Sequence, residues 1–509
     1  MPGSDTFDTY VTSDTSVTSD LVDTFDLVVL GIGSGGEYVA STAARRGMRV
    51  AAVEQRLVGG ECPFLACVPS KVLLVAASRA RTEGTDLQAA WATAVGARDE
   101  AIHHLDDSSQ ASDLADAGVT VVRGRGRVVA PGRLSVQPSG GGAERELTWT
   151  RMLLVGTGSS AVVPDVPGLA DVPTWTSDQA LTSTDLPGRL LVLGGGPVGC
   201  ELSQVYASFG VDVTLVETAP HLLPSEDPWV GEALQEHLEA SGVVVKVGVT
   251  LVGVRAVAGG TAADLRPAED AEPSEGSDAP AAAEHTGDPL VVDRVLVVTG
   301  RSPSGGGLGL EELGVAVDDT GAVPVDDRCR ALDAGGSPVD GVMAVGDVTG
   351  LAPYTHTANH QARVVLANLA GGDVHVRAAG IPRAVYTEPP VFAVGLGEDA
   401  AREAGHDVLV AHQDVGATAR SFVERLGAGT TEEDAGTAGL RLVCDRDGTL
   451  LGAAAIGPHA DSWGGELALA VTAGLGIGLL AEHTRAFPTW SEAITPPVLD
   501  LAEQIGRSR

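Results

Sequence analysis

Two cysteines, Cys62 and Cys67, lie five residues apart in the segment GGECPFLACVPSK, which runs from Gly59 to Lys71. Two thiols this close could be packed side chains, metal ligands or a redox pair that opens and closes. Zinc needs about four ligands, but no histidine lies near and the other cysteines, at positions 200, 329 and 444, are scattered singly. A metal site is therefore disfavoured, and packing and redox chemistry remain.

A disulfide between these two cysteines requires an irregular backbone. Residues i and i+5 of a regular α-helix have Cα atoms about 8–9 Å apart, whereas a disulfide normally needs less than about 7 Å. Pro63 directly follows Cys62, and Pro69 lies nearby. Because Gly59 and Gly60 precede the pair, we expect a distorted first turn. A helix N-terminus here would also stabilise a thiolate.

Two longer segments repeat one pattern: an apolar strand, a glycine-rich turn, a helix-length stretch and a second apolar strand that ends in glutamate. They cover Asp26–Glu54 and Arg189–Glu217. Their runs of Val and Leu suit strands buried in a parallel sheet. The turn glycines are Gly31, Gly33 and Gly36 in the first copy and Gly194, Gly196 and Gly199 in the second.

The spacing within both copies predicts dinucleotide binding. The first glycine permits a tight turn, the second lets the backbone approach a pyrophosphate, and the third lets helix and strand pack closely. The helix N-terminus then faces the phosphates. Glu54 and Glu217 each lie 23 residues after the first glycine of their copy, where a carboxylate can accept hydrogen bonds from a ribose. Two such sites predict electron transfer between two cofactors.

The second copy also indicates which nicotinamide nucleotide is bound. Glu217 is followed by Thr218, Ala219, Pro220 and His221, without Arg or Lys. A 2′-phosphate would therefore meet a carboxylate that has no cationic partner. We predict that NADH is preferred over NADPH.

Together these motifs resemble the class I pyridine nucleotide–disulfide oxidoreductases, which include dihydrolipoamide dehydrogenase, glutathione reductase and mercuric reductase. The redox motif of that family, Gly-Gly, Cys-x4-Cys and x-Pro-Ser-Lys, stands in the segment from Gly59 to Lys71. Further matching segments are VGTGSSAVVPDVPG from Val155, VTGRSP from Val298, MAVGDVTG from Met343 and VYTEPPVFAVGLGE from Val385. The resemblance covers nearly the whole chain.

The resemblance implies a role for each matched residue. Cys67 would be the charge-transfer thiolate against the flavin, and Cys62 the thiol that exchanges with the substrate. Lys71 would lie near flavin N5 and pair with Glu201. The implied cofactor residues are Gly31, Gly33, Gly36 and Glu54 for FAD, Asp347 for its ribityl chain, Gly194, Gly196, Gly199 and Glu217 for the nicotinamide nucleotide, and in addition Gly60, Lys71, Gly158 and Gly300.

The resemblance also implies an α/β fold with two Rossmann-like dinucleotide-binding domains, for FAD and NAD, and a C-terminal α+β dimerisation domain. We place the FAD domain at residues 23–165, completed by 299–375, and the NAD domain at 166–298. The interface domain takes 376–509. The family is homodimeric, with an active site shared between subunits.

Composition sets the remaining limits. Lys and Arg number 33 against 68 Asp and Glu, a net charge of −35, which opposes binding to nucleic acid or anionic membranes. No basic residue precedes Arg45, so a secretory signal is not expected, and we predict a cytoplasmic protein without a membrane partner. Residues 1–22 are predicted to be a disordered acidic tail, and about 264–289 a disordered insertion.

One departure from the family pattern bears on function. Disulfide-reducing members end in His-Pro-Thr-x-x-Glu, whose His is the acid and base for the exchange thiol, is held by the Glu and reaches across the dimer. Here the segment AFPTWSE ends at the matching catalytic candidate Glu492 but has Phe487 at the His position. Losing a positioned acid or base costs about 10²–10⁴ in rate. His483, four residues earlier, is a candidate replacement.

We therefore expect an FAD-dependent oxidoreductase that passes electrons from NADH to a redox-active Cys62–Cys67 disulfide. The final acceptor would be a small molecule that tolerates the missing His: a disulfide, a quinone or a metal ion. Mercuric reductases also lack this His, but they add a C-terminal cysteine pair that the ending AEQIGRSR does not have. Two alternatives are a dihydrolipoamide dehydrogenase that uses another base and a slow-turnover flavoprotein redox sensor.

Overall fold

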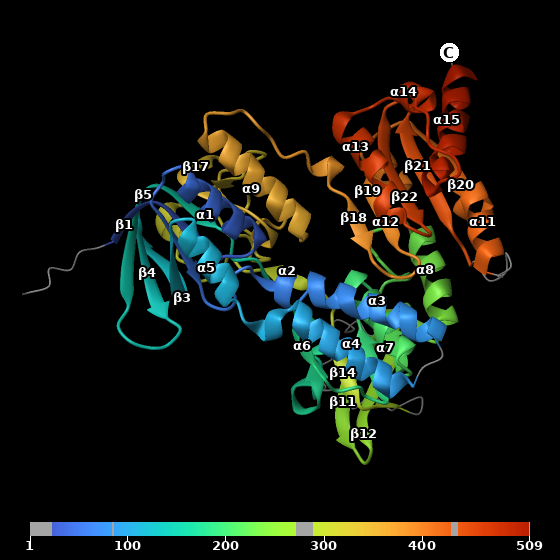
Figure 1. The fold of residues 1–509 in the computed structure, drawn as a ribbon, viewed down its shortest axis with the longest axis horizontal. Helices are drawn as coiled ribbons and strands as arrows, with labels where there is room; N and C mark the ends of the chain where they lie inside the picture. The colour runs from blue at the N-terminus through green and yellow to red at the C-terminus, as the bar shows by residue number, and fades with distance from the viewer. Residues whose placement is uncertain (1–22, 84–85, 271–288, 429–435, 508–509) are drawn as a thin grey trace, which may run out of the picture.

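The computed structural model describes residues 23–83, 86–270, 289–428 and 436–507. The expected acidic tail and most of the expected insertion, residues 271–288, lie outside these ranges. The described chain forms three parts, each built around its own sheet (Figure 1).

The first part is a seven-stranded sheet with helices on its faces. Its strands, in hydrogen-bonded order, are β1 (Asp23–Leu30), β2 (Val50–Glu54), β3 (Val119–Ala130), β4 (Arg133–Pro138), β5 (Arg145–Val155), β17 (Pro338–Ala344) and β16 (Arg330–Leu332), and β1 also pairs with β5. Parallel pairs join β1 to β2 and β5, and β5 to β17. Leu27, Val28 and Val29 of β1 are fully buried, which explains the continuous apolar run. Helix α1 (Ser34–Arg45) packs against the distant helix α9 (Thr355–Leu369).

The second part repeats the dinucleotide-binding pattern. Five parallel strands lie in the order β10 (Val244–Lys246), β9 (Asp212–Val216), β8 (Arg189–Leu193), β14 (Arg294–Val297) and β7 (Thr174–Trp175). Helices α6 (Ser177–Thr182), α7 (Pro197–Ser208) and α8 (Pro228–Ala240) belong to this part. Strands β11 (Val249–Val257), β12 (Gly260–Pro267) and β13 (Leu290–Val292) add an antiparallel sheet.

Two crossover strands connect the first and second parts. Strand β6 (Ser159–Ala161) leads out of the first part, β15 (Arg301–Pro303) leads back, and the two pair in antiparallel fashion. The chain therefore passes through the same narrow ribbon in both directions.

The segment with the two cysteines forms helices α2 (Glu61–Phe64) and α3 (Cys67–Glu83). They are followed by α4 (Leu87–Ala101) and α5 (Ser108–Asp116). Helix α3 packs against α4 and against α7 of the second part (Figure 1). By length and composition alone, the stretch Glu61–Thr82 is apolar enough to cross a membrane, with a mean hydropathy of 1.4. Of the window with that hydropathy, 33% is buried inside the structure, where α3 packs against α4 and α7. Length and composition alone are weak evidence for a membrane span.

The third part is a five-stranded antiparallel sheet covered by helices. Its strand order is β18 (Arg383–Val385), β19 (Val391–Gly395), β22 (Leu450–Ile456), β21 (Gly439–Asp445) and β20 (Val408–Asp414). The helices are α10 (Glu398–Glu403), α11 (Ala419–Ala428), α12 (Ala460–Trp463), α13 (Gly465–Ala473), α14 (Ile477–Glu482) and α15 (Thr495–Arg507). The predicted α/β fold class, with two Rossmann-like parts and a C-terminal α+β part, is confirmed.

Candidate active site

The first glycine loop lies between β1 and α1. Gly31 has φ +96°, and a Cβ there would lie 2.3 Å from the carbonyl oxygen of Gly156. A Cβ on Gly36 would lie 2.1 Å from the oxygen of Gly31, whereas a Cβ on Gly33 would meet no atom within 4 Å. The loop is therefore closed where helix and strand meet and open at the start of α1, which leaves space for a pyrophosphate at the helix N-terminus.

The second loop, between β8 and α7, has the same three environments. Gly194 has φ +110°, and a Cβ on it would lie 2.5 Å from the carbonyl oxygen of Val298. A Cβ on Gly199 would lie 1.9 Å from the oxygen of Gly194, and one on Gly196 would meet nothing within 4 Å. The residues present therefore fit a second dinucleotide.

Both predicted ribose carboxylates are fixed by the loop of their own copy. Glu54 accepts from the amide of Ile32 at 2.8 Å and from the amide two residues further on at 2.7 Å. Glu217 accepts from the amide of Gly195 at 2.6 Å and again from the amide two residues on, at 2.8 Å. Each carboxylate is thus held beside its glycine turn by backbone amides of its own copy.

The two cysteines lie on either side of a break in the helix. Helix α2 ends at Phe64 and α3 begins at Cys67, and both Cys62 and Cys67 are free, half-buried thiols. Gly60 has φ +76°, and a Cβ on it would lie 2.7 Å from the Cα atom of Gly33. The redox turn therefore packs directly onto the first glycine loop.

The two thiols differ in their electrostatic surroundings. The hydrogen bond from Cys62, aided by Thr355 and Lys71, lowers the pKa of Cys67 to about 6 against the opposing effect of burial. The same hydrogen bond, together with burial, raises the pKa of Cys62 well above its usual range. The Sγ atom of Cys67 lies 3.4 Å from Oγ1 of Thr355. Near neutral pH these surroundings favour the thiolate on Cys67 over a thiolate on Cys62.

A partly buried ion pair lies one turn further along α3. Lys71 Nζ donates to Oε2 of Glu201 at 2.7 Å, so the structure brings together two of the candidate catalytic residues. The other oxygen of Glu201 accepts from the amide of Tyr386 at 3.0 Å, and Lys71 Nζ lies 4.3 Å from the centroid of the Tyr386 ring. Three distant segments therefore fix the position of the lysine ammonium.

The remaining cofactor candidates lie at the crossover. Asp347 accepts from the hydroxyl of Ser159 at 2.7 Å. Gly158 and Gly300 have φ +72° and +144°, and a Cβ on either would meet nothing within 4 Å. Both glycines thus have a positive φ and lie beside open space.

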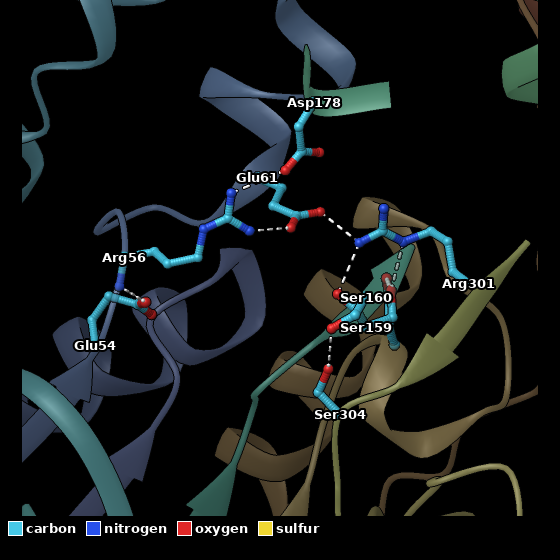
Figure 2. A network of polar contacts seen from close by, with 9 residues as sticks. Glu54, Arg56, Glu61, Ser159, Ser160, Asp178, Arg301 and Ser304 are labelled. Atoms are coloured by element: carbon cyan, nitrogen blue, oxygen red, sulfur yellow. Dashed lines mark hydrogen bonds and ion pairs between the residues drawn. The ribbon is translucent and has the colours of Figure 1, made fainter. Parts of the chain in front are cut away.

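A chain of charged groups joins the redox turn to the crossover (Figure 2). Glu61 accepts from Arg56 at 2.9 Å and from Arg301 at 2.6 Å. Arg56 also donates to Asp178 of α6 at 2.9 Å, and Arg301 donates to the hydroxyl of Ser159 at 2.7 Å. The residue directly before Cys62 is therefore tied to both crossover strands and to the second part.

Sequence reasoning did not identify this network. The available signals were a charged residue, Glu61, directly before Cys62, and the arginine of the VTGRSP segment, Arg301. Thr355, the residue in contact with Cys67, carried no signal because it lies 288 positions away.

Glu492 lies apart from the thiols, in the third part of the chain. Its carboxylate accepts from the backbone amide of Arg420 at 3.1 Å, and Phe487 has a side chain that is 77% exposed. His483 lies 3.9 Å from Glu466. Among the described residues, no hydrogen bond or ion pair joins a histidine to Glu492, and no group of three or more His, Cys, Asp or Glu side chains is placed to hold a metal ion.

Comparison with known proteins agrees with this geometry. Residues 25–362 match the family described as pyridine nucleotide-disulphide oxidoreductase, and residues 381–497 match its dimerisation domain. Dihydrolipoyl dehydrogenase of Synechocystis sp. is 32% identical over 92% of this chain and 97% of its own length. Dihydrolipoyl dehydrogenase of Thermus scotoductus is 33% identical over 94% of this chain and 97% of its own length.

A solved structure extends the comparison. The HOCl-induced flavoprotein disulfide reductase RclA of Escherichia coli, determined as a Cu(II) complex, superposes with a TM-score of 0.76 and 26% identity, covering 96% of this chain and 100% of its own. The glycine loops, the thiol pair and the matches along both segments lead to one conclusion. The chain belongs to the pyridine nucleotide–disulphide oxidoreductases, FAD-dependent enzymes that carry a dimerisation domain.

Proposed function

We propose that this protein oxidises NADH and passes the electrons through its Cys62–Cys67 pair to a small-molecule acceptor that needs no proton from an imidazole. Such acceptors include a metal ion such as Cu(II), a quinone and an activated disulfide. The observation that carries the proposal is Phe487, an exposed phenyl ring where disulfide-reducing members have histidine.

The chain supplies the groups that hold and orient the cofactors. FAD, when bound, supplies a two-electron carrier between a hydride donor and a disulfide. Gly33 and Asp347 would hold it, and Lys71, fixed by Glu201 at 2.7 Å, would place a positive charge beside its ring. Gly196 opens the loop that would take NADH.

The thiols divide the remaining chemistry between them. When the disulfide is reduced, its S–S bond breaks, and the surrounding groups favour a thiol at Cys62 and a thiolate at Cys67. An oxidant at Cys62 withdraws two electrons and the S–S bond forms again. With Cu(II), one NADH and two Cu(II) ions give NAD⁺, two Cu(I) ions and one proton.

The acceptor class follows from the missing imidazole. Opening an unactivated disulfide releases a basic thiolate that needs a proton, whereas one-electron reduction of a metal ion releases none. Phe487 cannot supply that proton. The Cu(II) complex of the structurally similar RclA makes Cu(II) the first metal to test.

A second function, dihydrolipoyl dehydrogenase, is favoured by the names of the relatives. It would need another acid and base, and His483 near Glu466 is the candidate. The dimerisation segment supports a homodimer, in which the partner subunit's C-terminal segment would approach Cys62. A cytoplasmic location fits both functions and remains a prediction.

Steady-state NADH oxidation with a panel of acceptors tests the proposal. Wild type should reduce Cu(II), a naphthoquinone or an aromatic disulfide at least tenfold more efficiently than lipoamide. Phe487→His should raise lipoamide activity, with His483→Ala as the matched control. Wild-type lipoamide turnover of hundreds per second that His483→Ala abolishes would establish the second function. Slow turnover with every acceptor would indicate a redox sensor.

A further inference from the structure

We propose that Thr355 is a catalytic residue whose hydroxyl donates a hydrogen bond to Cys67 and so keeps the negative charge on that sulfur while Cys62 reacts. The inference rests on the proposed function only in taking Cys62 and Cys67 as the reacting pair. It concerns the flavin-side sulfur, whereas the missing imidazole would act on the exchange thiol, Cys62.

The geometry places the hydroxyl on the sulfur. Oγ1 of Thr355 lies 3.4 Å from Sγ of Cys67, a normal separation for a hydrogen bond that involves sulfur. Both side chains are half-buried, so water competes less for the thiolate than it would at the surface. Because a thiolate can only accept, the hydroxyl must be the donor when Cys67 is ionised.

Two helices begin at this contact. Cys67 is the first residue of α3, which has 17 residues, and Thr355 is the first residue of α9, which has 15. The N-terminal end of each helix carries a partial positive charge, and a helix N-terminus lowers the pKa of a cysteine. The backbone therefore favours an anion where the two side chains meet.

The other groups facing Cys67 cannot take over this role throughout a reaction cycle. Lys71 favours the thiolate, but Glu201, which neutralises that lysine, disfavours it. Cys62 is the strongest donor to Cys67 in the dithiol. Once Cys62 has bonded to a substrate or a metal ion, it no longer has an S–H group to donate. Thr355 is then the remaining neutral donor whose contact with the Cys67 sulfur the structure describes.

This argument defines the test. The variants are made in a Cys62→Ala background, in which Cys67 has no partner for a disulfide. In the purified FAD-containing enzyme, the long-wavelength charge-transfer absorbance measured against pH then reports the ionisation of Cys67. We expect Thr355→Val to raise the apparent pKa of Cys67 by about one pH unit or more, because a hydrogen bond to a charged group is lost. Thr355→Ser should restore a value close to that of the Cys62→Ala parent.

Thr357→Val is the matched control. Thr357 lies in the same helix, is 1% exposed, and its hydroxyl has no hydrogen-bond partner among the described residues. Its loss should leave the Cys67 titration unchanged. The proposal would be overturned if the apparent pKa of Cys67 were the same in Thr355→Val and in the parent. It would also be overturned if Thr355→Val and Thr357→Val shifted that pKa equally.

A second measurement serves if a variant loses the charge-transfer absorbance band. The pH dependence of Cys67 alkylation, read by peptide mass spectrometry, reports the same ionisation without the flavin signal. If the parent shows no charge-transfer band although FAD is bound, the proposed function fails, because Cys67 then does not lie against the flavin. Alkylation still decides the role of Thr355 in that case, since only an effect of its hydroxyl on ionisation would support the proposal.

Discussion

The two dinucleotide loops have the same glycine geometry but different neighbours. In the first, Gly33 lies under the redox turn, where a Cβ on Gly60 would lie 2.7 Å from its Cα atom. In the second, Gly195 faces Glu217 of its own copy, with the Glu217 side chain 2.9 Å from a Cβ built on Gly195. The first loop therefore packs against the thiol turn through its backbone, whereas the helix after the second loop meets the thiol segment through a side-chain ion pair, Glu201 with Lys71.

The residues that follow Glu54 and Glu217 also differ in their contacts with the thiol turn. Arg56 stands two residues after Glu54 and donates to Glu61 beside the thiol turn. Ala219 stands at the matched position after Glu217 and donates only through its backbone. The same fold unit is thus tied to the thiol turn by a side-chain ion pair in the first copy, whereas Ala219 of the second copy has no charged side chain that could form one.

The largest predicted effect comes from replacing the third glycine of each loop, because the two replacements should impair different cofactors. Gly36→Ala places a methyl group 2.1 Å from a carbonyl oxygen, and Gly199→Ala places one at 1.9 Å. We expect Gly36→Ala to yield colourless, unstable protein. Gly199→Ala should stay yellow with FAD but lose about 10²-fold or more in kcat/KM for NADH through misplacement of the nucleotide. Absorbance spectra and NADH kinetics measure both.

The control for that pair is Gly96→Ala in α4, where a Cβ would meet nothing within 4 Å. It should leave FAD content and kinetics unchanged and stabilise the helix by about 0.5–1 kcal/mol. Loss of FAD in Gly199→Ala would show that the two loops are not independent.

The next effect isolates the thiols from the nucleotide loop. Cys67→Ser and Cys62→Ser should each lower acceptor turnover by about 10³-fold or more, while NADH still bleaches the flavin in single turnover. Resting Cys62→Ser should show long-wavelength absorbance that Cys67→Ser lacks. In the wild-type dithiol, where Cys67 has a pKa of about 6, this absorbance should be present at pH 7.5 and disappear as the pH falls below 6. Absorbance retained in Cys67→Ser would reverse the two roles.

A smaller effect concerns the nucleotide itself. Residues 218–221, which follow Glu217, include no Arg or Lys, so kcat/KM should be about tenfold higher with NADH than with NADPH, or about 1.4 kcal/mol. Ala219→Arg places an arginine at the position that Arg56 holds in the first copy. It should lower the ratio of kcat/KM with NADH to kcat/KM with NADPH, because the guanidinium can pair with the 2′-phosphate of NADPH. Ala219→Gln, of similar length but uncharged, is the control. Equal efficiencies in wild type would mean that a cation from elsewhere reaches the phosphate.

The smallest effect tests the link between redox turn and crossover. Glu61→Gln keeps the shape of the side chain but removes its charge from between Arg56 and Arg301, both partly exposed. We expect a loss of about 1 kcal/mol or less in stability, measured as a drop in Tm that salt reduces. Asp178→Asn removes a charge from the outer end of the same network and should cost less. A larger loss in Asp178→Asn would place the main anchor on the second part.

Sequence patterns predicted those features of the structure that residues close together in the chain determine. Tight turns at Gly31 and Gly194 and the irregular helix between Cys62 and Cys67 follow from glycine spacing, prolines and distance limits within a short segment. The apolar runs indicated the buried parallel strands of the two glycine-rich segments, whereas the full fold class, with its C-terminal domain, followed from the resemblance to the family.

The rest of the site depends on pairs far apart in the chain. Arg301 meets Glu61 across 240 positions, and Thr355 meets Cys67 across 288. Neither pair has a local pattern, because both are fixed only when the crossover strands and α9 pack against the first sheet. The contact of Gly60 with Gly33 was hidden for the same reason, since each glycine already had a local explanation.

That glycine contact has a consequence for building chimeric enzymes. Because no side chain fits at position 60 while the backbone of Gly33 stays in place, the first loop and the redox turn must be transplanted into another scaffold as one cassette. The second loop leads into α7, whose Glu201 pairs with Lys71 of the thiol segment at 2.7 Å. An exchange of the second loop to change the electron donor must therefore keep Glu201, so on the NADH side the transferable unit ends before that residue, whereas on the FAD side it includes the thiol turn.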